Sequence, residues 1–518
     1  MEFTEKNDLL KLTLLGLVFI LWCYWLWSRK EFYILAMRFP GLLGLPFFGV
    51  LHRIRSLDNI ISEFGKLLKD CGKFTILTWI GTYPVILTAD PAFIKDVLCS
   101  NDLLEKAQPL YQPLYNAFKG GLIASPADEW HKNRRMLNPS FHQKVLTTFL
   151  PIFNKAKDGA IQKFGEMISN KEVLLSEELQ RITLSITVET TMGKKMQEGD
   201  QVSEELVKAY VICIEKLPME CFLSYVKLGK WYAQFSKTAK EYVYRFIEEL
   251  LYQKLSQTVS RKSCTYTMEC SENSETNVED SFGGNAFNER APNIFVDQAI
   301  NLYREGKMSH HSLIGESNTI VSAAFETSAN GLLSSLLMLA IHPVVQERLY
   351  DEIVSVFPEK TFFMDYEHMQ HLPYLDMVVN ETLRLLPPIP IIGRQVVKNT
   401  TLSNGLVLPR GLEILISIFD LHRRTDIWGA NAHEFNPDNF LPGNLEEKHT
   451  HAYIPFSKGI RNCIGWKYAL MAIKILLAGL VRNFSFSTSV KLEDLKFTNS
   501  LSLKYTNEPA FTIKHRLK

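Results

Sequence analysis

The chain has 518 residues, of which 46% are hydrophobic, so it can bury a large core. Lys and Arg number 57 and Asp and Glu 56, which leaves a formal net charge of +1. This balance gives no whole-chain field that favours a polyanion, and we do not expect nucleic acid as a partner. The eight cysteines lack the spacing of a disulfide scaffold or a zinc site, so we expect most to be free thiols in a reducing compartment.

The first predicted element is an apolar helix at the N-terminus. Residues 12–27 (LTLLGLVFILWCYWLW) carry no charge and, with the three residues before them, reach roughly the length that crosses a bilayer. Arg29, Lys30 and Arg38 follow, whereas acidic residues precede, so the positive-inside rule places the rest of the chain in the cytosol. No small-residue cleavage site follows, which favours an uncleaved anchor over residues 1–30 rather than the alternative, a removed secretory signal.

Turn and strand signals come next along the chain. Residues 39–46 (FPGLLGLP) contain prolines and glycines that break any helix, and they predict a stiff turn between the anchor and the body. Between Thr75 and Thr88, β-branched and aromatic residues flank Gly81-Thr82, which predicts a strand pair. Short strands are also expected near residues 406–419 and at the C-terminus.

A polar segment at about residues 256–292 is rich in Gly, Asn and Ser and has few large apolar groups. This composition predicts a mobile loop that interrupts the helices without dividing domains. Most of the remaining chain has helical patterning. We therefore expect residues 31–518 to form one body that is mainly α with a small β subdomain (α+β).

A long helical pattern runs from His311 to Ile341 and is ended by Pro343. Its middle holds Glu326 and Thr327 between small apolar residues. A carboxylate beside a hydroxyl in an apolar helix can organise water for proton delivery, and the threonine can bond a carbonyl one turn back. For an isolated Glu-Thr pair, a solvated helix face is the commoner explanation.

Two further residue pairs share a helical face. Glu381 and Arg384 stand at i and i+3 just before two prolines and should form an ion pair. On spacing alone this is an exposed pair worth about 0.3–0.5 kcal/mol. Trp130 and Arg134 stand at i and i+4, where an exposed surface arginine is the default interpretation.

The most informative segment is residues 456–465 (FSKGIRNCIG), with one candidate thiolate, Cys463. Gly459 and Gly465 would let the backbone fold tightly around the sulfur so that N–H groups point at it. Phe456 can shield the sulfur from water, and Arg461 suits a carboxylate. This pattern is suited to a haem iron bound through cysteine sulfur.

Residues 466–483 read as a helix directly after this segment. Its positive N-terminal end would favour the thiolate form of Cys463. The alternative is a buried free cysteine in front of a core helix, where cysteine acts as a small hydrophobe.

These motifs resemble those of the cytochrome P-450 haem-thiolate monooxygenases, whose signature Phe-x-x-Gly-x-Arg-x-Cys-x-Gly is matched at every specified position. The segments 130–142, 421–440 and 456–470 are most similar to the microsomal family-four clan, many of insects. The resemblance implies the P-450 fold behind one transmembrane helix, and haem b with Cys463 bound to iron. Ala323 stands where many members carry a glutamate that esterifies the haem, so we expect a non-covalent porphyrin.

The resemblance also implies roles for the other residues. Glu326 and Thr327 would handle protons, although Ala324 replaces the usual glycine beside them. Contacts to the haem propionates would come from Arg461, Trp130, Arg134 and Arg394. Glu381 and Arg384 would be buried near the proximal face, with Asn439 where the family commonly has an arginine.

The implied reaction inserts one oxygen atom of O₂ into an apolar substrate and reduces the other to water, at the endoplasmic reticulum membrane with the catalytic domain in the cytosol. We find no Gly-x-Gly-x-x-Gly after a strand, so the electrons should come from a separate NADPH–cytochrome reductase. A b-type cytochrome is a second candidate donor. Lys458, Lys467 and Lys474 are candidates for the docking face, with ordinary solvated lysines as the alternative.

Substrate contacts are expected from the segments 110–122, 222–235, 389–392 and 500–503 and from Phe325. Fatty acids, hormone-like lipids, steroids and xenobiotics all stay open, because a mostly apolar pocket selects by shape. One alternative activity is a haem-thiolate isomerase or dehydratase, which would not need Glu326 and Thr327. A second is a non-catalytic haem-binding sensor or lipid carrier.

Overall fold

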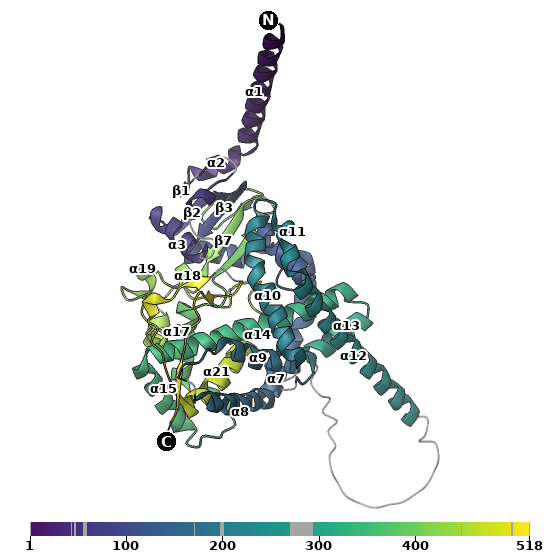
Figure 1. Cartoon of the computed structure of the whole chain (residues 1–518), viewed down its shortest axis with the longest axis vertical. Helices are drawn as coiled ribbons and strands as arrows, with labels where there is room; N and C mark the ends of the chain where they lie inside the picture. The colour runs from purple at the N-terminus through teal and green to yellow at the C-terminus, as the bar shows by residue number, and fades with distance from the viewer. Residues whose placement is uncertain are drawn as a thin grey trace, which may run out of the picture.

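The computed structural model describes residues 2–42, 44–45, 48–54, 60–169, 171–196, 201–269, 294–446, 448–498 and 501–516. Helices dominate and the strands gather in small sheets, so the expected mainly helical fold with a small β subdomain is confirmed. In Figure 1 the helices form the body, the largest sheet lies at one end of it, and the first helix extends beyond that end.

The described α-helices are α1 (Glu2–Ser28), α2 (Lys30–Ala36), α3 (Ile60–Asp70), α4 (Pro91–Cys99), α5 (Gln108–Phe118), α6 (Ala127–Leu137), α7 (Gln143–Leu146), α8 (Leu150–Met167), α9 (Ser176–Thr187), α10 (Gln201–Ser224), α11 (Gly229–Tyr232), α12 (Lys237–Glu269), α13 (Phe295–Arg304), α14 (His310–Ile341), α15 (Pro343–Val356), α16 (Tyr366–Gln370), α17 (Pro373–Leu385), α18 (Ile418–Leu421), α19 (Thr425–Trp428), α20 (Pro442–Glu446) and α21 (Trp466–Asn483). The strands are β1 (Gly41–Leu42), β2 (Thr75–Ile80), β3 (Tyr83–Thr88), β4 (Ile391–Gln395), β5 (Thr400–Thr401), β6 (Val407–Leu408), β7 (Glu413–Ser417), β8 (Phe484–Ser487), β9 (Phe497–Thr498), β10 (Lys504–Tyr505) and β11 (Thr512–His515).

Two helices in the described part of the chain are long and apolar enough to cross a membrane, the Lys11–Ser28 portion of α1 and all of α14. Helix α14 is 83% buried in the protein, so its apolar surface already packs against other helices. The Lys11–Ser28 segment has no buried residue. Of the two, only α1 has the exposure of a helix that could lie in lipid.

The largest sheet has the strand order β1-β2-β3-β7-β4. Strands β2 and β3 pair antiparallel with Thr75 opposite Thr88 and Ile80 opposite Tyr83, which confirms the predicted strand pair. The turn between them uses Gly81 at φ +59°, a conformation that glycine adopts without strain. Strand β3 then pairs parallel with β7, so the N-terminal hairpin is joined to a segment from far along the chain.

Helix α14 forms the centre of the helical body and packs against α9, α17 and α21. It begins one residue before the predicted start and ends at Ile341, ahead of the proline. Ser309 caps it through a bond from the Ser312 N–H to its hydroxyl. Helix α21 has the predicted bounds and buries one face in the same core.

The first part of the segment at about residues 256–292, where a loop was expected, is helical. Helix α12 continues to Glu269, so the first part of that segment is helical, and residues 270–293 lie outside the described part of the chain. The prediction failed because Ser and Thr lower helix propensity only slightly when a helix is already formed. Six cysteines within the described chain are free thiols, as expected: Cys23, Cys71, Cys99, Cys213, Cys221 and Cys463.

Candidate active site

A cavity of about 300 Å³ lies inside the helical body, a volume typical of small-molecule sites. Its lining includes Glu326 and Thr327 from α14 and Cys463 from the segment before α21. The structure thus brings the candidate sulfur ligand and the acid-alcohol pair to one cavity, although they are far apart in the sequence. Predicted residues that also line it are Phe456, Gly465, Trp130, Arg134 and Arg461.

The backbone around Cys463 folds as a tight loop. The Cys463 N–H donates to the Phe456 carbonyl at 3.0 Å, and Ser457 and Gly459 take positive φ values of 59° and 76°. A Cβ on Gly459 would lie 2.0 Å from the Leu98 carbonyl oxygen, so only glycine fits there.

Gly465 has an ordinary backbone conformation, unlike Gly459. Its φ is −95°, and a Cβ there would meet no protein atom within 4 Å. None of the described residues crowds this position so closely that only glycine fits. Its contribution is the backbone N–H, which is hydrogen-bonded to the Cys463 sulfur and lowers the pKa of that thiol.

Cys463 is open to the cavity, yet it is surrounded by protein on its other sides. Burial raises the pKa of its thiol, while the Gly465 N–H and the Arg134 guanidinium lower it. Gly465 is the N-cap of α21, so the helix start acts in the predicted direction, but burial outweighs it. A metal cation bound to the sulfur would favour the thiolate form.

A cluster of cations lies beside the cavity. Arg461 is 6% exposed and donates to the carbonyls of Leu104 and Ser125, each at 2.8 Å, while its Nε has no partner. Arg394 is 1% exposed and bonds the Gly393 carbonyl at 3.0 Å.

Lys106 completes the cluster, and sequence reasoning missed it. Its ammonium lies 4.4 Å from the centre of the Tyr111 ring, and it lines the cavity. Burial lowers the pKa of Lys106 well below its ordinary value, and Arg394 and Arg461 lower it further; burial and Arg394 reduce that of Arg461 to about 9. None of the three forms an ion pair with a described carboxylate, so the cluster suits a ligand that carries two negative charges.

Arg134 and Trp130 lie on one face of α6, as predicted. Arg134 donates to the backbone oxygen of Asn462 at 2.7 Å and to its side-chain oxygen at 3.0 Å. Arg134 thus holds Asn462, the residue directly before Cys463, through two hydrogen bonds. Trp130 is 3% exposed, and its ring centre lies 4.8 Å from the Arg461 guanidinium carbon, a cation–π contact.

Glu326 is buried and Thr327 is half-buried at the cavity wall, so the acid-alcohol pair does not form a solvated helix face. Thr327 donates to the Ala323 carbonyl at 2.7 Å, the predicted bond one turn back. Glu326 is 5% exposed and accepts from the Ser502 hydroxyl at 2.9 Å and from Gln180 at 3.3 Å. Burial raises the pKa of Glu326, and its hydrogen bonds offset part of that rise.

Glu381 and Arg384 form a fully buried pair, joined by two bonds of 2.7 Å between carboxylate and guanidinium. Arg384 also donates to the carbonyls of Ala432 at 2.6 Å and Glu434 at 3.0 Å. The Asn439 amide donates to the carboxylate of Glu381 at 3.0 Å. An amide therefore takes the third place in this network without adding a charge.

His422 was missed by sequence reasoning and connects this network to the cysteine segment. Its Nδ1 bonds the Arg384 carbonyl at 3.2 Å, and its Nε2 accepts from the Ile454 N–H at 2.9 Å. The ring is fully buried, and burial, together with Arg384, lowers the pKa of His422 to about 3. It is therefore a neutral ring that links two segments.

One predicted substrate contact is wrong. Phe325 is completely buried and does not line the cavity. Its ring packs against Tyr210 instead, with the two ring centres 5.1 Å apart. Of the three candidate docking lysines, Lys474 is 14% exposed and forms an ion pair with Asp376. Lys458 bonds the Thr450 carbonyl, and Lys467 lies 5.4 Å from the Trp466 ring centre.

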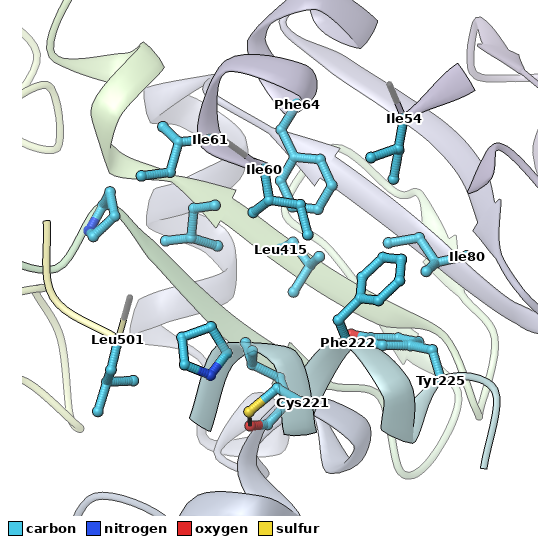
Figure 2. Close-up of a pocket in the computed structure, with 14 residues that line it drawn as sticks. Ile54, Ile60, Ile61, Phe64, Ile80, Cys221, Phe222, Tyr225, Leu415 and Leu501 are labelled. Atoms are coloured by element: carbon cyan, nitrogen blue, oxygen red, sulfur yellow. Dashed lines mark hydrogen bonds between the residues drawn. The ribbon is translucent and has the colours of Figure 1, made fainter. Parts of the chain in front are cut away.

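A second, smaller apolar cavity of about 110 Å³ adjoins the first and shares Leu110, Ile391 and Leu501 with it. Figure 2 shows Phe64 of α3 on one side of this cavity, Phe222 of α10 on the other and Leu415 of β7 between them. Of the expected substrate segments, 110–122, 389–392 and 500–503 contribute to the larger cavity. The 222–235 segment contributes only to the smaller one.

Known proteins provide an independent comparison. The family model described as Cytochrome P450 matches residues 39–511. "Probable cytochrome P450 313a4" of Drosophila melanogaster is 35% identical over 510 residues, covering 97% of this chain and 98% of the relative. "Cytochrome P450 4p1" of the same species is 30% identical over 423 residues, covering 81% of this chain and 79% of the relative.

Proposed function

The chain belongs to the cytochrome P450 family of haem-thiolate monooxygenases, and we propose from this premise that it oxygenates an apolar substrate at a membrane. One atom of O₂ enters the substrate and the other leaves as water, with two electrons from NADPH and the two protons needed to complete the water. The single observation that carries this proposal is the placement of Cys463, Glu326 and Thr327 on one cavity.

The residues around the cavity fit haem. Cys463 would bind the iron through sulfur, and the cations Arg461, Arg394 and Lys106 would neutralise the two propionates. When bound, haem supplies the redox chemistry that activates O₂, which a cysteine ligand favours. Ala323 lines the cavity and carries no carboxylate, which supports a non-covalent porphyrin.

Glu326 and Thr327 would move protons within the cavity. The hydroxyl hydrogen of Thr327 is held by the Ala323 carbonyl, so its oxygen faces outward as an acceptor for water. Because the pKa of Glu326 is raised, its carboxyl group keeps a proton at a higher pH than an exposed glutamate does. A buried acid that can hold and release a proton is what the proposed reaction requires.

The proposed substrate is apolar because the lining is mostly aliphatic and aromatic. Side chains that line the larger cavity from four separate segments include Leu114, Phe118, Ile320, Ile389 and Ile473. Burial against such a surface favours a hydrocarbon at about 25 cal/mol per Å². Lipids, hormone-like compounds and xenobiotics all meet this description.

We place the protein at the endoplasmic reticulum membrane with residues 1–30 as the anchor and residues 31–518 as a cytosolic catalytic domain. The exposed apolar helix α1 supports the anchor. Trp231 and Phe235, 59% and 56% exposed, lie near α11 at the same end of the body as α1 and would add apolar contact with lipid. The electron donors would be NADPH–cytochrome reductase and, as a second donor, a b-type cytochrome.

The test is a reduced carbon-monoxide difference spectrum of the full-length protein, followed by turnover with reductase and NADPH across a panel of apolar compounds. We expect a thiolate-type Soret shift in the wild type and its loss in Cys463→Ala. Cys71→Ala, at a free thiol that does not line the cavity, should keep the shift. No shift in the wild type, or an unchanged spectrum in Cys463→Ala, contradicts the proposal.

A further inference from the structure

Three polar residues form a stripe on helix α14. Glu326, Asn330 and Ser334 follow one another at four-residue spacing, so they lie on one helical face. All three bond the segment that enters strand β10: Glu326 bonds Ser502 at 2.9 Å, Asn330 bonds the same serine at 2.8 Å, and Ser334 bonds Tyr505 at 2.9 Å. The stripe is buried, with exposures of 5%, 8% and 4%.

Ser502 holds the central place in this arrangement. The Asn330 amide donates to its hydroxyl oxygen, so the serine hydrogen is directed to the carboxylate of Glu326. Gln180 donates to the other carboxylate oxygen at 3.3 Å. Both oxygens of Glu326 therefore accept from fixed donors, which stabilise the charge left when the carboxyl group releases a proton.

The segment around Ser502 is held in place and touches the cavity. The Leu503 N–H donates to the Pro388 carbonyl at 2.7 Å, and Asn330 also bonds the Leu503 carbonyl at 3.3 Å. Ser502 is 1% exposed and lines the larger cavity together with Leu501. The Ser502 hydroxyl at the cavity wall thus fixes the orientation of the Glu326 carboxylate.

We infer that Ser502, held by Asn330, is a positioning residue that orients Glu326 and makes release of its proton easier. This inference rests on the proposed function, in which Glu326 supplies protons for the reduction of one oxygen atom to water. Loss of the serine hydroxyl leaves Glu326 with one donor fewer in a buried site. Proton supply from Glu326 then slows, and more O₂ is released as hydrogen peroxide, which takes up the two electrons from NADPH and two protons from water without forming product.

The experiment uses the full-length, haem-loaded protein with reductase and a substrate from the panel. It compares Ser502→Ala, Ser502→Thr, Glu326→Gln and the double variant Ser502→Ala/Glu326→Gln. The readouts are the carbon-monoxide spectrum, the substrate-induced spectral shift, and the ratio of product to NADPH consumed. Ser334→Ala is the matched control, because it removes a hydroxyl bond to the same C-terminal segment without touching Glu326.

We expect Ser502→Ala to keep both spectra while the product ratio falls roughly tenfold, the effect of losing one hydrogen bond to a charged group. Ser502→Thr should restore most of the ratio, and the control should match the wild type. The double variant should be no worse than Glu326→Gln, because the serine acts through the glutamate. If Ser502→Ala loses the carbon-monoxide spectrum, the fallback variant is Asn330→Ala, which removes the donor to Ser502 and a longer bond of 3.5 Å to Glu326 but leaves the serine hydroxyl in place. It should keep the spectrum and lower the product ratio.

Three outcomes overturn the inference alone: a wild-type product ratio in Ser502→Ala, losses that multiply in the double variant, or an equal drop in Ser334→Ala. A wild-type protein without the thiolate-type spectrum, or without turnover of any compound, overturns the proposed function and the inference together.

Discussion

The neutral ring of His422 makes a sharp prediction about stability and pH. In the folded protein its pKa is about 3, whereas an unfolded chain has a histidine pKa near 6.5. Between these values the unfolded chain binds a proton that the folded protein does not bind. The contribution of His422 to stability is therefore fully present above about pH 6.5 and is lost progressively as the pH falls towards 3.

The size of the effect follows from the two pKa values. One pH unit in this window corresponds to about 1.4 kcal/mol, so lowering the pH from 7.5 to 5.0 should cost about 2 kcal/mol through this group alone. Glu316 and Glu413 act in the opposite direction, because burial raises the pKa of each to about 7 and the folded state then binds protons more tightly. The contribution of His422 is therefore isolated by comparing the pH dependence of the free energy of unfolding in the wild type and in a variant without this histidine.

The assay is urea unfolding of the full-length protein at pH 7.5 and pH 5.0, followed by circular dichroism. A glutamine at position 422 offers a donor and an acceptor but does not titrate. The free energy of unfolding of His422→Gln should therefore be about 1–3 kcal/mol lower than that of the wild type at pH 7.5. Between pH 7.5 and pH 5.0 it should then fall by less than that of the wild type. The exposed His371→Gln serves as the control and should follow the wild type.

Equal pH dependence of the free energy of unfolding in the wild type and His422→Gln would refute the reasoning. It would mean that His422 is accessible to protons in the folded state, contrary to its complete burial.

Further outcomes follow from the site. Gly459→Ala should lower the free energy of unfolding in urea far more than Gly465→Ala does. At position 459 the left-handed backbone alone costs an alanine about 1–2 kcal/mol, and the new Cβ would also meet the Leu98 carbonyl. Comparable losses in the two variants would contradict this. Arg384→Met leaves the Glu381 carboxylate buried without its cation and should lower the free energy of unfolding by about 3–5 kcal/mol. Asn439→Ala removes one amide donor and should lower it by about 1.5–3 kcal/mol. The reverse order in calorimetric unfolding would contradict the proposed network. Lys106→Met should speed haem transfer to apomyoglobin roughly tenfold, because one charged contact to haem is lost. Lys69→Met, at an exposed lysine, should transfer haem at the wild-type rate. Equal transfer rates in the two variants would show that Lys106 does not hold haem.

Local patterns in the sequence predicted local structure well. The hairpin between Thr75 and Thr88 and the bounds of α21 are as expected, because strand alternation, a glycine turn and an apolar helical face are all encoded within a few neighbouring residues. The ion pair of Glu381 and Arg384 is also local, although its complete burial is not a property of the spacing.

Contacts between distant segments could not be predicted in this way. His422 with Ile454, Lys106 beside Arg394 and Arg461, and Ser502 with Glu326 join residues from separate elements, and no spacing rule connects them. Gly465 fits its expectation through its backbone, since its N–H bonds the Cys463 sulfur, although a Cβ at this position would meet no described protein atom within 4 Å. Phe325 shows that neighbouring helix residues face different directions, so adjacency to Glu326 did not place it in the cavity.

The parallel pairing of β3 with β7 constrains how the polypeptide is made. Val85 lies opposite Glu413, about 330 residues later in synthesis. At roughly 5–20 residues per second, a ribosome needs about 15–65 s to produce the second strand after the first. During that interval the edge of β3 that will pair with β7 has no partner strand, so the largest sheet is completed only when translation is nearly finished.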